Sequence, residues 1–89
     1  MNPWNLVVAA SASRSLDRLA EGVAAAIVEF MLGPLCEKPP VAGTPLRREL
    51  TGYWPARRGA YRIVYRLDYE RHDVLVVRIQ HRSDVYLPR

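Results

Sequence analysis

The most constraining feature of this sequence is a change in the spacing of its apolar residues, from a helical period in the first half to alternation in the second. Between residues 14 and 31 apolar side chains recur at steps of three and four, as on one face of a helix: Leu16, Leu19, Val23, Ile27, Phe30 and Met31. Tyr61–Asp68 instead alternates apolar and polar residues, as a half-buried strand does. A chain of 89 residues has room for one core. We therefore predict a single α+β domain over residues 1–89.

The first half is predicted to be a strand followed by two helices. Asn5–Ala10 is a short apolar run, typical of a buried strand, and the hydroxyls of Ser11 and Ser13 are candidate N-caps for the helix after it. Gly22 costs a helix about 1 kcal/mol relative to alanine. This cost favours two helices packed as a hairpin over one long rod, and the Gly33–Pro34 pair is expected to end the helical stretch.

The second half is predicted to be a three-strand antiparallel meander. An irregular connection over residues 37–45 leads to a strand within Thr51–Arg58, which Pro55 restricts to a sheet edge or a bulge. Tyr61–Asp68 then forms a hairpin with Val74–Gln80 through the polar turn at Tyr69–Asp73. The helices are expected to cover one face of the sheet and leave the other open.

Basic residues concentrate in this second half. The chain carries 13 Lys and Arg against 9 Asp and Glu, a net charge of +4. Residues 1–46 hold three of the basic side chains and four acids, whereas residues 47–89 hold ten arginines and five acids. Codon usage alone would spread arginine evenly, so the asymmetry indicates a basic face of the kind that binds nucleic acid. A basic surface that serves only solubility is the open alternative.

Alternation places those arginines on the uncovered face of the sheet. Arg62, Val64, Arg66 and Asp68 share one side of their strand, and Arg78 joins them if the strand register allows. With Arg57 and Arg58 beside them, these residues predict a surface that binds phosphate.

The compartment is predicted from cysteine use and hydropathy. Cys36 is the only cysteine, which excludes an internal disulfide, and it is interpreted as a small packed side chain. No apolar run approaches the roughly 18 residues of a membrane span, and the N-terminus lacks the pattern of a secretory signal. We therefore expect a cytoplasmic protein with no membrane contact.

Several kinds of catalytic site lack their motifs. His72 and His81 have no second ligand at metal-binding spacing, and the glycines form neither a phosphate loop nor a dinucleotide fingerprint. A serine nucleophile is equally unsupported. We therefore expect no metal and no cofactor.

The residues that remain suit metal-free cleavage of RNA, in which the ribose 2′-hydroxyl attacks the adjacent phosphate. Such a reaction needs cations on the phosphate oxygens, a base and an acid. His81 can exchange a proton near neutral pH, and Tyr86 can act as a base beside guanidinium charge or stack on a nucleobase. The set that meets these needs is Arg57, Arg58, Arg62, His81, Arg82 and Tyr86. Each of them taken alone also fits an ordinary surface or packing role.

Two segments resemble a known family. Leu50–Tyr65 (LTGYWPARRGAYRIVY) and His81–Tyr86 (HRSDVY) are similar to the RelE toxins of bacterial type II toxin-antitoxin modules, within the RelE/ParE superfamily, and above all to those of actinobacteria such as mycobacteria. The resemblance implies a ribosome-dependent endoribonuclease that cuts mRNA in the A site and inhibits translation. It also implies neutralisation by a RelB-type antitoxin, and contact with operator DNA only as the toxin-antitoxin complex.

The resemblance assigns roles to individual residues. Arg62 matches the family's strand arginine that contacts the scissile phosphate, and Tyr86 matches its C-terminal tyrosine. Tyr53 and Pro55 stand where some RelE members have lysines, so Arg57 and Arg58 would substitute for them. Gln80 stands where the family has an arginine, with His81 and Arg82 beside it. Arg47 and Arg48 are expected to contact ribosomal RNA or antitoxin acids.

Two other functions stay open at this point. A ParE-like toxin inhibits DNA gyrase and cleaves nothing, on the same fold. A member that has lost the nuclease would still bind antitoxin.

Overall fold

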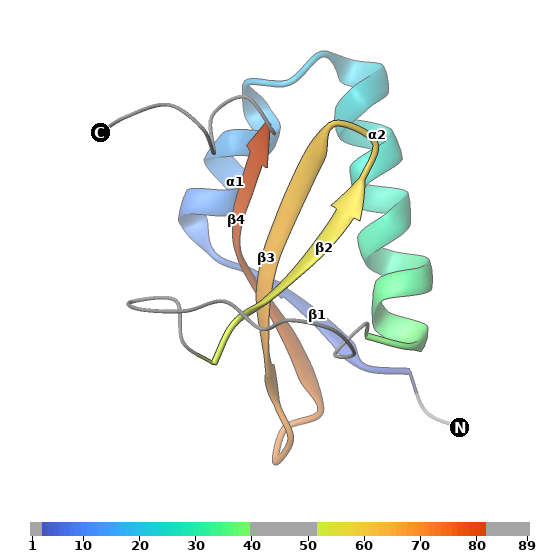
Figure 1. Ribbon diagram of the computed structural model, residues 1–89, viewed down its shortest axis with the longest axis vertical. Helices are drawn as coiled ribbons and strands as arrows, with labels where there is room; N and C mark the ends of the chain where they lie inside the picture. Colours follow the sequence, from blue (N-terminus) through green and yellow to red (C-terminus); the bar gives the residue numbers. More distant parts are fainter. Residues whose placement is uncertain (1–2, 40–51, 82–89) are drawn as a thin grey trace.

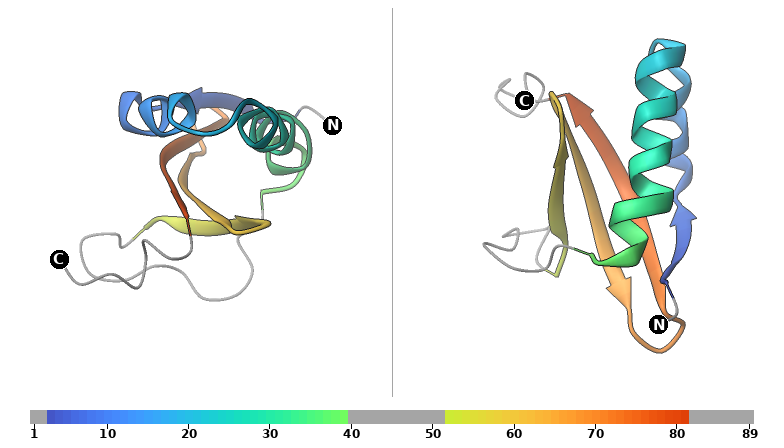
Figure 2. Two further views of the ribbon diagram at one scale, coloured as in Figure 1. Left: turned by 90° about the horizontal axis from the view of Figure 1, so that it is seen from above. Right: turned by 90° about the vertical axis from the view of Figure 1, so that its right-hand side faces the viewer.

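The computed structural model of the protein describes residues 3–39 and 52–81, which form a twisted four-stranded sheet with two helices on one face (Figure 1). The elements in chain order are β1 (Asn5–Val8), α1 (Ala10–Asp17), α2 (Glu21–Phe30), the π-helical turn η1 (Met31–Leu35), β2 (Trp54–Arg58), β3 (Tyr61–Asp68) and β4 (Asp73–His81). The views in Figure 2 show both helices on the same side of the sheet. The predicted α+β class is confirmed.

The strands lie in the order β1-β4-β3-β2. β2, β3 and β4 pair antiparallel, as the predicted meander requires, and β1 runs parallel to β4. The prediction that the first strand is buried is wrong, because β1 lies at the sheet edge and Val7 on its outer face is 41% exposed. The first and last of the described strands are thus neighbours, a long-range pairing that closes the fold.

A bulge in β4 connects the sheet to the start of α1. Val64 of β3 pairs with Arg78 and Tyr65 pairs with Val76, so Val77 is an extra residue without a partner in β3. The hydroxyl of Ser11 donates a hydrogen bond of 2.7 Å to the carbonyl of Val77. The bulge therefore leaves a carbonyl free, and α1 supplies its donor.

This contact corrects the predicted helix caps. The N-cap of α1 is Ala9, which makes no side-chain cap bond, and both Ser11 and Ser13 lie inside the helix. The backbone N–H of Ala9 donates to the carbonyl of Val76 at 2.8 Å. The sheet, rather than a serine cap, fixes where α1 begins.

The helical hairpin is confirmed, but its break precedes Gly22. α1 ends at Asp17 and α2 begins at Glu21. Between them the N–H of Arg18 donates to the carbonyl of Ser15 at 3.2 Å, and the N–H of Leu19 donates to Leu16 at 3.1 Å. These tighter bonds end α1 with a 3₁₀-type turn, and Gly22 falls in the first turn of α2.

The Gly33–Pro34 pair does not end the helical stretch, contrary to the prediction. Both residues lie inside η1, which continues directly from α2. Proline lacks an N–H, and in an α-helix its ring clashes with the carbonyl of the residue four positions earlier. The i→i+5 spacing of the π turn changes which carbonyl lies next to the ring. The N–H of Trp4 then donates to the carbonyl of Cys36 at 2.9 Å, which ties the end of this stretch to the entry of β1.

The strand limits differ slightly from prediction. β2 starts at Trp54, and β4 extends one residue beyond Val74–Gln80 at each end. The two-residue turn at Gly59 and Ala60, with Gly59 at φ 61°, joins β2 to β3. Of the predicted connection over residues 37–45, only residues 37–39 are described.

The core lies between the helices and the sheet. Ile27, Met31 and Leu35 from the helical layer belong to one cluster with buried residues of β3 and β4. Its buried members are Ala12, Ile27, Met31, Leu35, Cys36, Ala56, Ile63, Tyr65, Val74, Val76 and Ile79. Val23, predicted on the same apolar face, is 37% exposed. Cys36 is packed as predicted, and burial raises the pKa of its thiol.

Within residues 3–39 and 52–81, no helix has the length and apolar character needed to cross a membrane.

Candidate nucleic-acid interface

The strand register gathers four arginines on the face of the sheet opposite the helices. Arg57 of β2 lies opposite Arg62 of β3, and Val64 lies opposite Arg78 of β4. Arg66 is two residues beyond Val64 on the same side of β3. We call Arg57, Arg62, Arg66 and Arg78 the arginine face. The pairing of Arg78 with Val64 confirms the prediction that Arg78 joins Arg62 and Arg66 on one face.

Acidic side chains on this side of the sheet lie at its far end. Asp68 and Asp73 face each other where β3 and β4 meet the hairpin turn. There Nε of Arg71 forms an ion pair of 3.9 Å with Oδ2 of Asp68, and the backbone N–H of Arg71 donates a hydrogen bond of 3.1 Å to Oδ1 of the same carboxylate. Among the residues that the structure describes, no acid pairs with the arginine face. Within the part of the chain that the structure describes, its positive charge is therefore not neutralised.

Arg62 is the most constrained residue of this face. Its Nη2 donates a hydrogen bond of 3.1 Å to Oε1 of Gln80, its cross-strand neighbour in β4. Its Nε is buried and has no hydrogen-bond partner among residues 3–39 and 52–81. A buried donor without an acceptor costs about 1–3 kcal/mol.

The centre of the arginine face is apolar. Val64 lies between Arg62 and Arg66 on β3 and has no exposed surface, although it is outside the main core. The prediction of a fully open face is therefore wrong at this point.

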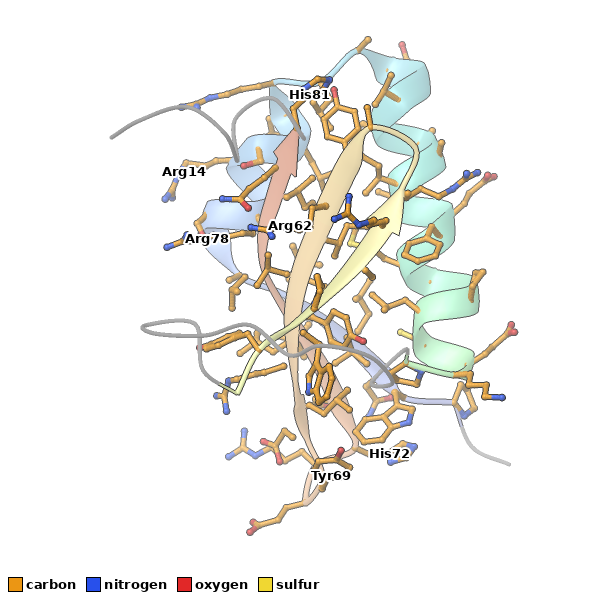
Figure 3. All side chains as sticks on the ribbon, in the orientation of Figure 1. Arg14, Arg62, Tyr69, His72, Arg78 and His81 are labelled. Carbon is orange, nitrogen blue, oxygen red and sulfur yellow. The ribbon has the colours of Figure 1, made fainter. Side chains whose placement is uncertain are left out.

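His81 lies on the other side of the sheet from Arg62. It pairs with Tyr61 in the register and contacts that ring edge-on, with 5.1 Å between ring centroids. Together with Ser15, Arg18, Leu19 and Ile79, these two residues line a pocket of about 200 Å³ beside α1. The backbones of His81 and Arg62 are close, because Arg62 pairs with Gln80, the residue before His81. Their side chains nevertheless lie on opposite sides of the sheet and do not meet (Figure 3).

Arg57 and Arg58 are divided between the two faces, because adjacent residues of a strand point to opposite sides. Arg58 lines a pocket of about 330 Å³ on the α2 side, beside Val23, Ala26 and Ile27. Only Arg57 of this pair belongs to the arginine face.

The remaining predicted site residues, Arg47, Arg48, Arg82 and Tyr86, lie outside the described residues. No three His, Cys, Asp or Glu side chains gather as metal ligands within residues 3–39 and 52–81. His72, in the hairpin turn at φ 59°, stacks on Trp4 with ring centroids 4.1 Å apart. It lies with Tyr69 at the opposite end of the sheet from His81 (Figure 3).

Sequence reasoning missed the role of Gln80 as the partner of Arg62. The two residues are 18 positions apart, and their contact depends on the pairing of β3 with β4. The signal that was present is alternation, because Gln80 is two residues beyond Arg78 and therefore lies on the same side of β4.

Comparison with known proteins identifies the family of this chain. A family model described as the ParE toxin of type II toxin-antitoxin systems, parDE, matches residues 6–86. The chain belongs to this family. Two toxins of Mycobacterium tuberculosis are similar to it over nearly their whole length. Toxin RelG is 44% identical and covers 94% of this chain and 97% of its own, and Toxin RelE is 46% identical and covers 96% and 88%.

Solved structures agree. The toxin-antitoxin complex RelBE2 of Mycobacterium tuberculosis contains a chain with a TM-score of 0.84 and 44% identity, covering 94% of this chain and 97% of that one. The isolated RelE toxin of E. coli has a TM-score of 0.71 at 23% identity and covers 93% and 90%, which shows the shared fold. The protein is thus a RelE-like member of the ParE toxin family, the toxin component of a type II system.

Proposed function

We propose that this toxin is an mRNA endoribonuclease that acts on the ribosome and inhibits translation. The observation that carries the proposal is Arg62, whose buried Nε–H has no partner and which lies among three further arginines unpaired with any described acid. Arginine binds phosphate through several N–H groups in a fixed plane, and it stays charged at every physiological pH. The face therefore supplies donors where a backbone phosphate needs them.

The proposed reaction uses no metal and no cofactor. The ribose 2′-hydroxyl attacks the adjacent phosphorus, the bond to the 5′-oxygen breaks, and a 2′,3′-cyclic phosphate and a 5′-hydroxyl are left. Arg62 stabilises the charge that builds on the nonbridging oxygens, and Arg57, Arg66 and Arg78 hold the flanking phosphates. Fixed donors of this kind contribute a factor of about 10²–10³ each.

Proton transfer is assigned to Tyr86 rather than His81. His81 contacts Tyr61 on the helix side of the sheet and does not face the phosphate that Arg62 would bind. Tyr86 is proposed for this role because it matches the C-terminal tyrosine of RelE toxins. Arg82 is proposed to contact the reacting phosphate, and Arg47, Arg48 and Arg58 to contact ribosomal RNA or acidic residues of the antitoxin.

The proposed partner is a RelB-type antitoxin. A solved structure 44% identical to this chain is a toxin-antitoxin complex, which supports the same partnership here. We propose that the toxin reaches operator DNA only within that complex, and that both proteins act in the cytoplasm, where ribosomes are found.

The test is to induce the toxin without antitoxin and to map the 5′ ends of cellular mRNA. The expected result is growth arrest with cuts inside translated frames, which disappear when an initiation inhibitor blocks translation. Arrest with intact mRNA and DNA damage signalling would replace the nuclease with gyrase inhibition. Normal growth at equal soluble expression would leave an inactive antitoxin-binding member.

A further inference from the structure

Gln80 and Arg62 form a pair across the two central strands. They are register partners on the arginine face, and Nη2 of Arg62 donates to Oε1 of Gln80 at 3.1 Å. The other register partner of Arg62, in β2, is Arg57. The guanidinium of Arg62 therefore has a cation on one side and a neutral amide on the other.

The neutral amide has consequences that a charged residue would not have. A basic residue at position 80 would repel Arg62, since like charges directly opposite in a sheet destabilise it. A carboxylate there would hold Arg62 equally well but would neutralise its charge and bind it as an ion pair. Glutamine supplies an acceptor oxygen and leaves the full positive charge of Arg62 in place.

The contact also leaves donors for a ligand. A guanidinium has five N–H groups, and the hydrogen bond to Gln80 uses one of those on Nη2. The buried Nε is without a partner among the described residues. A side chain fixed through one nitrogen, with another nitrogen unpaired, is already oriented before an anion arrives, so less conformational freedom is lost on binding.

We propose that Gln80 is a positioning residue, which holds the guanidinium of Arg62 through a neutral acceptor so that the remaining N–H groups of its outer nitrogens are oriented toward the scissile phosphate. The inference rests on the proposed function and deepens it, because it names how the phosphate-binding group is oriented. Gln80 acts through Arg62 and does not itself contact the reacting atoms.

The first test is single-turnover cleavage of mRNA on purified, programmed ribosomes with two variants. Gln80→Met keeps the length of the side chain without a strong acceptor, and it should lower the cleavage rate about 10- to 100-fold, since small misplacements cost up to about 10²-fold. The ribosome concentration at half-maximal rate should change less than about twofold. Gln80→Glu keeps the acceptor but adds charge, and it should slow cleavage without lowering the melting temperature. A wild-type rate for either variant would overturn the proposal.

The second test asks whether Gln80 acts through Arg62. In an Arg62→Ala background, adding Gln80→Met should change the residual rate by less than about twofold, because the group it positions is gone. If Gln80→Met lowers that rate by the same factor as in the wild type, Gln80 acts on the RNA directly and the positioning role is wrong.

The third test needs no cleavage. In the ¹⁵N-labelled full chain, the Arg62 Nε–H resonance should exchange slowly with water and shift when a 2′-O-methyl trinucleotide is added. Gln80→Met should speed the exchange and weaken the shift, while the Arg71 resonance stays unchanged as an internal control. Unaltered Arg62 exchange in Gln80→Met would overturn the proposal. A wild-type toxin that fails to cut mRNA but shows this dependence would refute the nuclease and keep the positioning role.

Discussion

The two faces of the sheet differ in the burial of their apolar side chains and in the pairing of their polar groups. The inner face is covered by α1 and α2, and its residues Ile63, Tyr65, Val74 and Val76 have no exposed surface. The outer face carries the arginine face and a buried donor that lacks a partner. Apolar burial on one side stabilises the fold, and the other side keeps charge that the fold does not neutralise. The difference supports the proposal that the outer face binds RNA, whereas the inner face stabilises the fold.

The largest expected effect is on the inner face. Ile63→Ala removes a fully buried side chain and should lower the free energy of unfolding by about 2–5 kcal/mol. Urea denaturation of the purified toxin measures it. The folded fraction should retain its cleavage rate per molecule. A large loss of rate without a loss of stability would contradict the claim that the inner face contributes to stability and not to cleavage.

Arg62→Ala should have the opposite profile on the outer face. Removing the donors aimed at the phosphate should slow cleavage about 10²–10³-fold and abolish growth arrest. The free energy of unfolding should change by less than about 1.5 kcal/mol, because one hydrogen bond is lost together with one buried unsatisfied donor. Growth arrest by the Arg62→Ala variant at equal soluble expression would contradict the role assigned to Arg62.

The position of Arg62 and Arg66 on one face was predictable from alternation alone, because a strand has a period of two. The pairing of Arg62 with Gln80 and the placement of His81 were not, since both depend on the register of β3 with β4. That register shifts at Val77, where α1 supplies the donor Ser11. The parallel pairing of β1 with β4 joins residues about 70 positions apart, and no local pattern encodes it.

Alkaline pH should affect the inner face first. Burial raises the pKa values of Tyr65 and Cys36, so their neutral forms are favoured in the folded state. This stability is present below the unfolded pKa values, near 8.5 for cysteine and 10 for tyrosine, and is lost as pH rises above them. The free energy of unfolding should fall by about 1.4 kcal/mol per pH unit for each group. Chemical denaturation from pH 7 to 11 tests this.

The matched control for the alkaline transition is Cys36→Ala, which should remove the part of the slope that begins below pH 10. A slope unchanged in this variant would show that the thiol is not the group responsible.

A smaller effect is expected for an outer arginine away from the reacting phosphate. Arg78→Gln should weaken binding of a 2′-O-methyl oligoribonucleotide and reduce the slope of log K against log salt concentration by about 0.7, the value for one phosphate contact on a single strand. Fluorescence anisotropy measures both quantities. Arg71→Gln is the control, because Arg71 lies at the hairpin turn beside Asp68, and its slope should match the wild type.

The smallest effect is expected for His81. His81→Ala should change the cleavage rate by less than about threefold, or about 0.6 kcal/mol in the barrier, because the imidazole contacts Tyr61 on the helix side. A loss of about 100-fold, together with a missing limb in the pH profile of the rate, would assign proton transfer to His81 instead of Tyr86.

The most direct measurement of the central claim is a titration of the ¹⁵N-labelled toxin with a 2′-O-methyl trinucleotide, followed through the Nε–H resonances of its arginines. Arginines lie on both sides of the sheet, so their resonances report which side binds the trinucleotide. The expected result is that Arg57, Arg62, Arg66 and Arg78 shift with one affinity, whereas Arg18 and Arg58, which line pockets beside the helices, do not. Shifts confined to Arg18 and Arg58 would contradict the account and place the nucleic acid on the other side of the sheet.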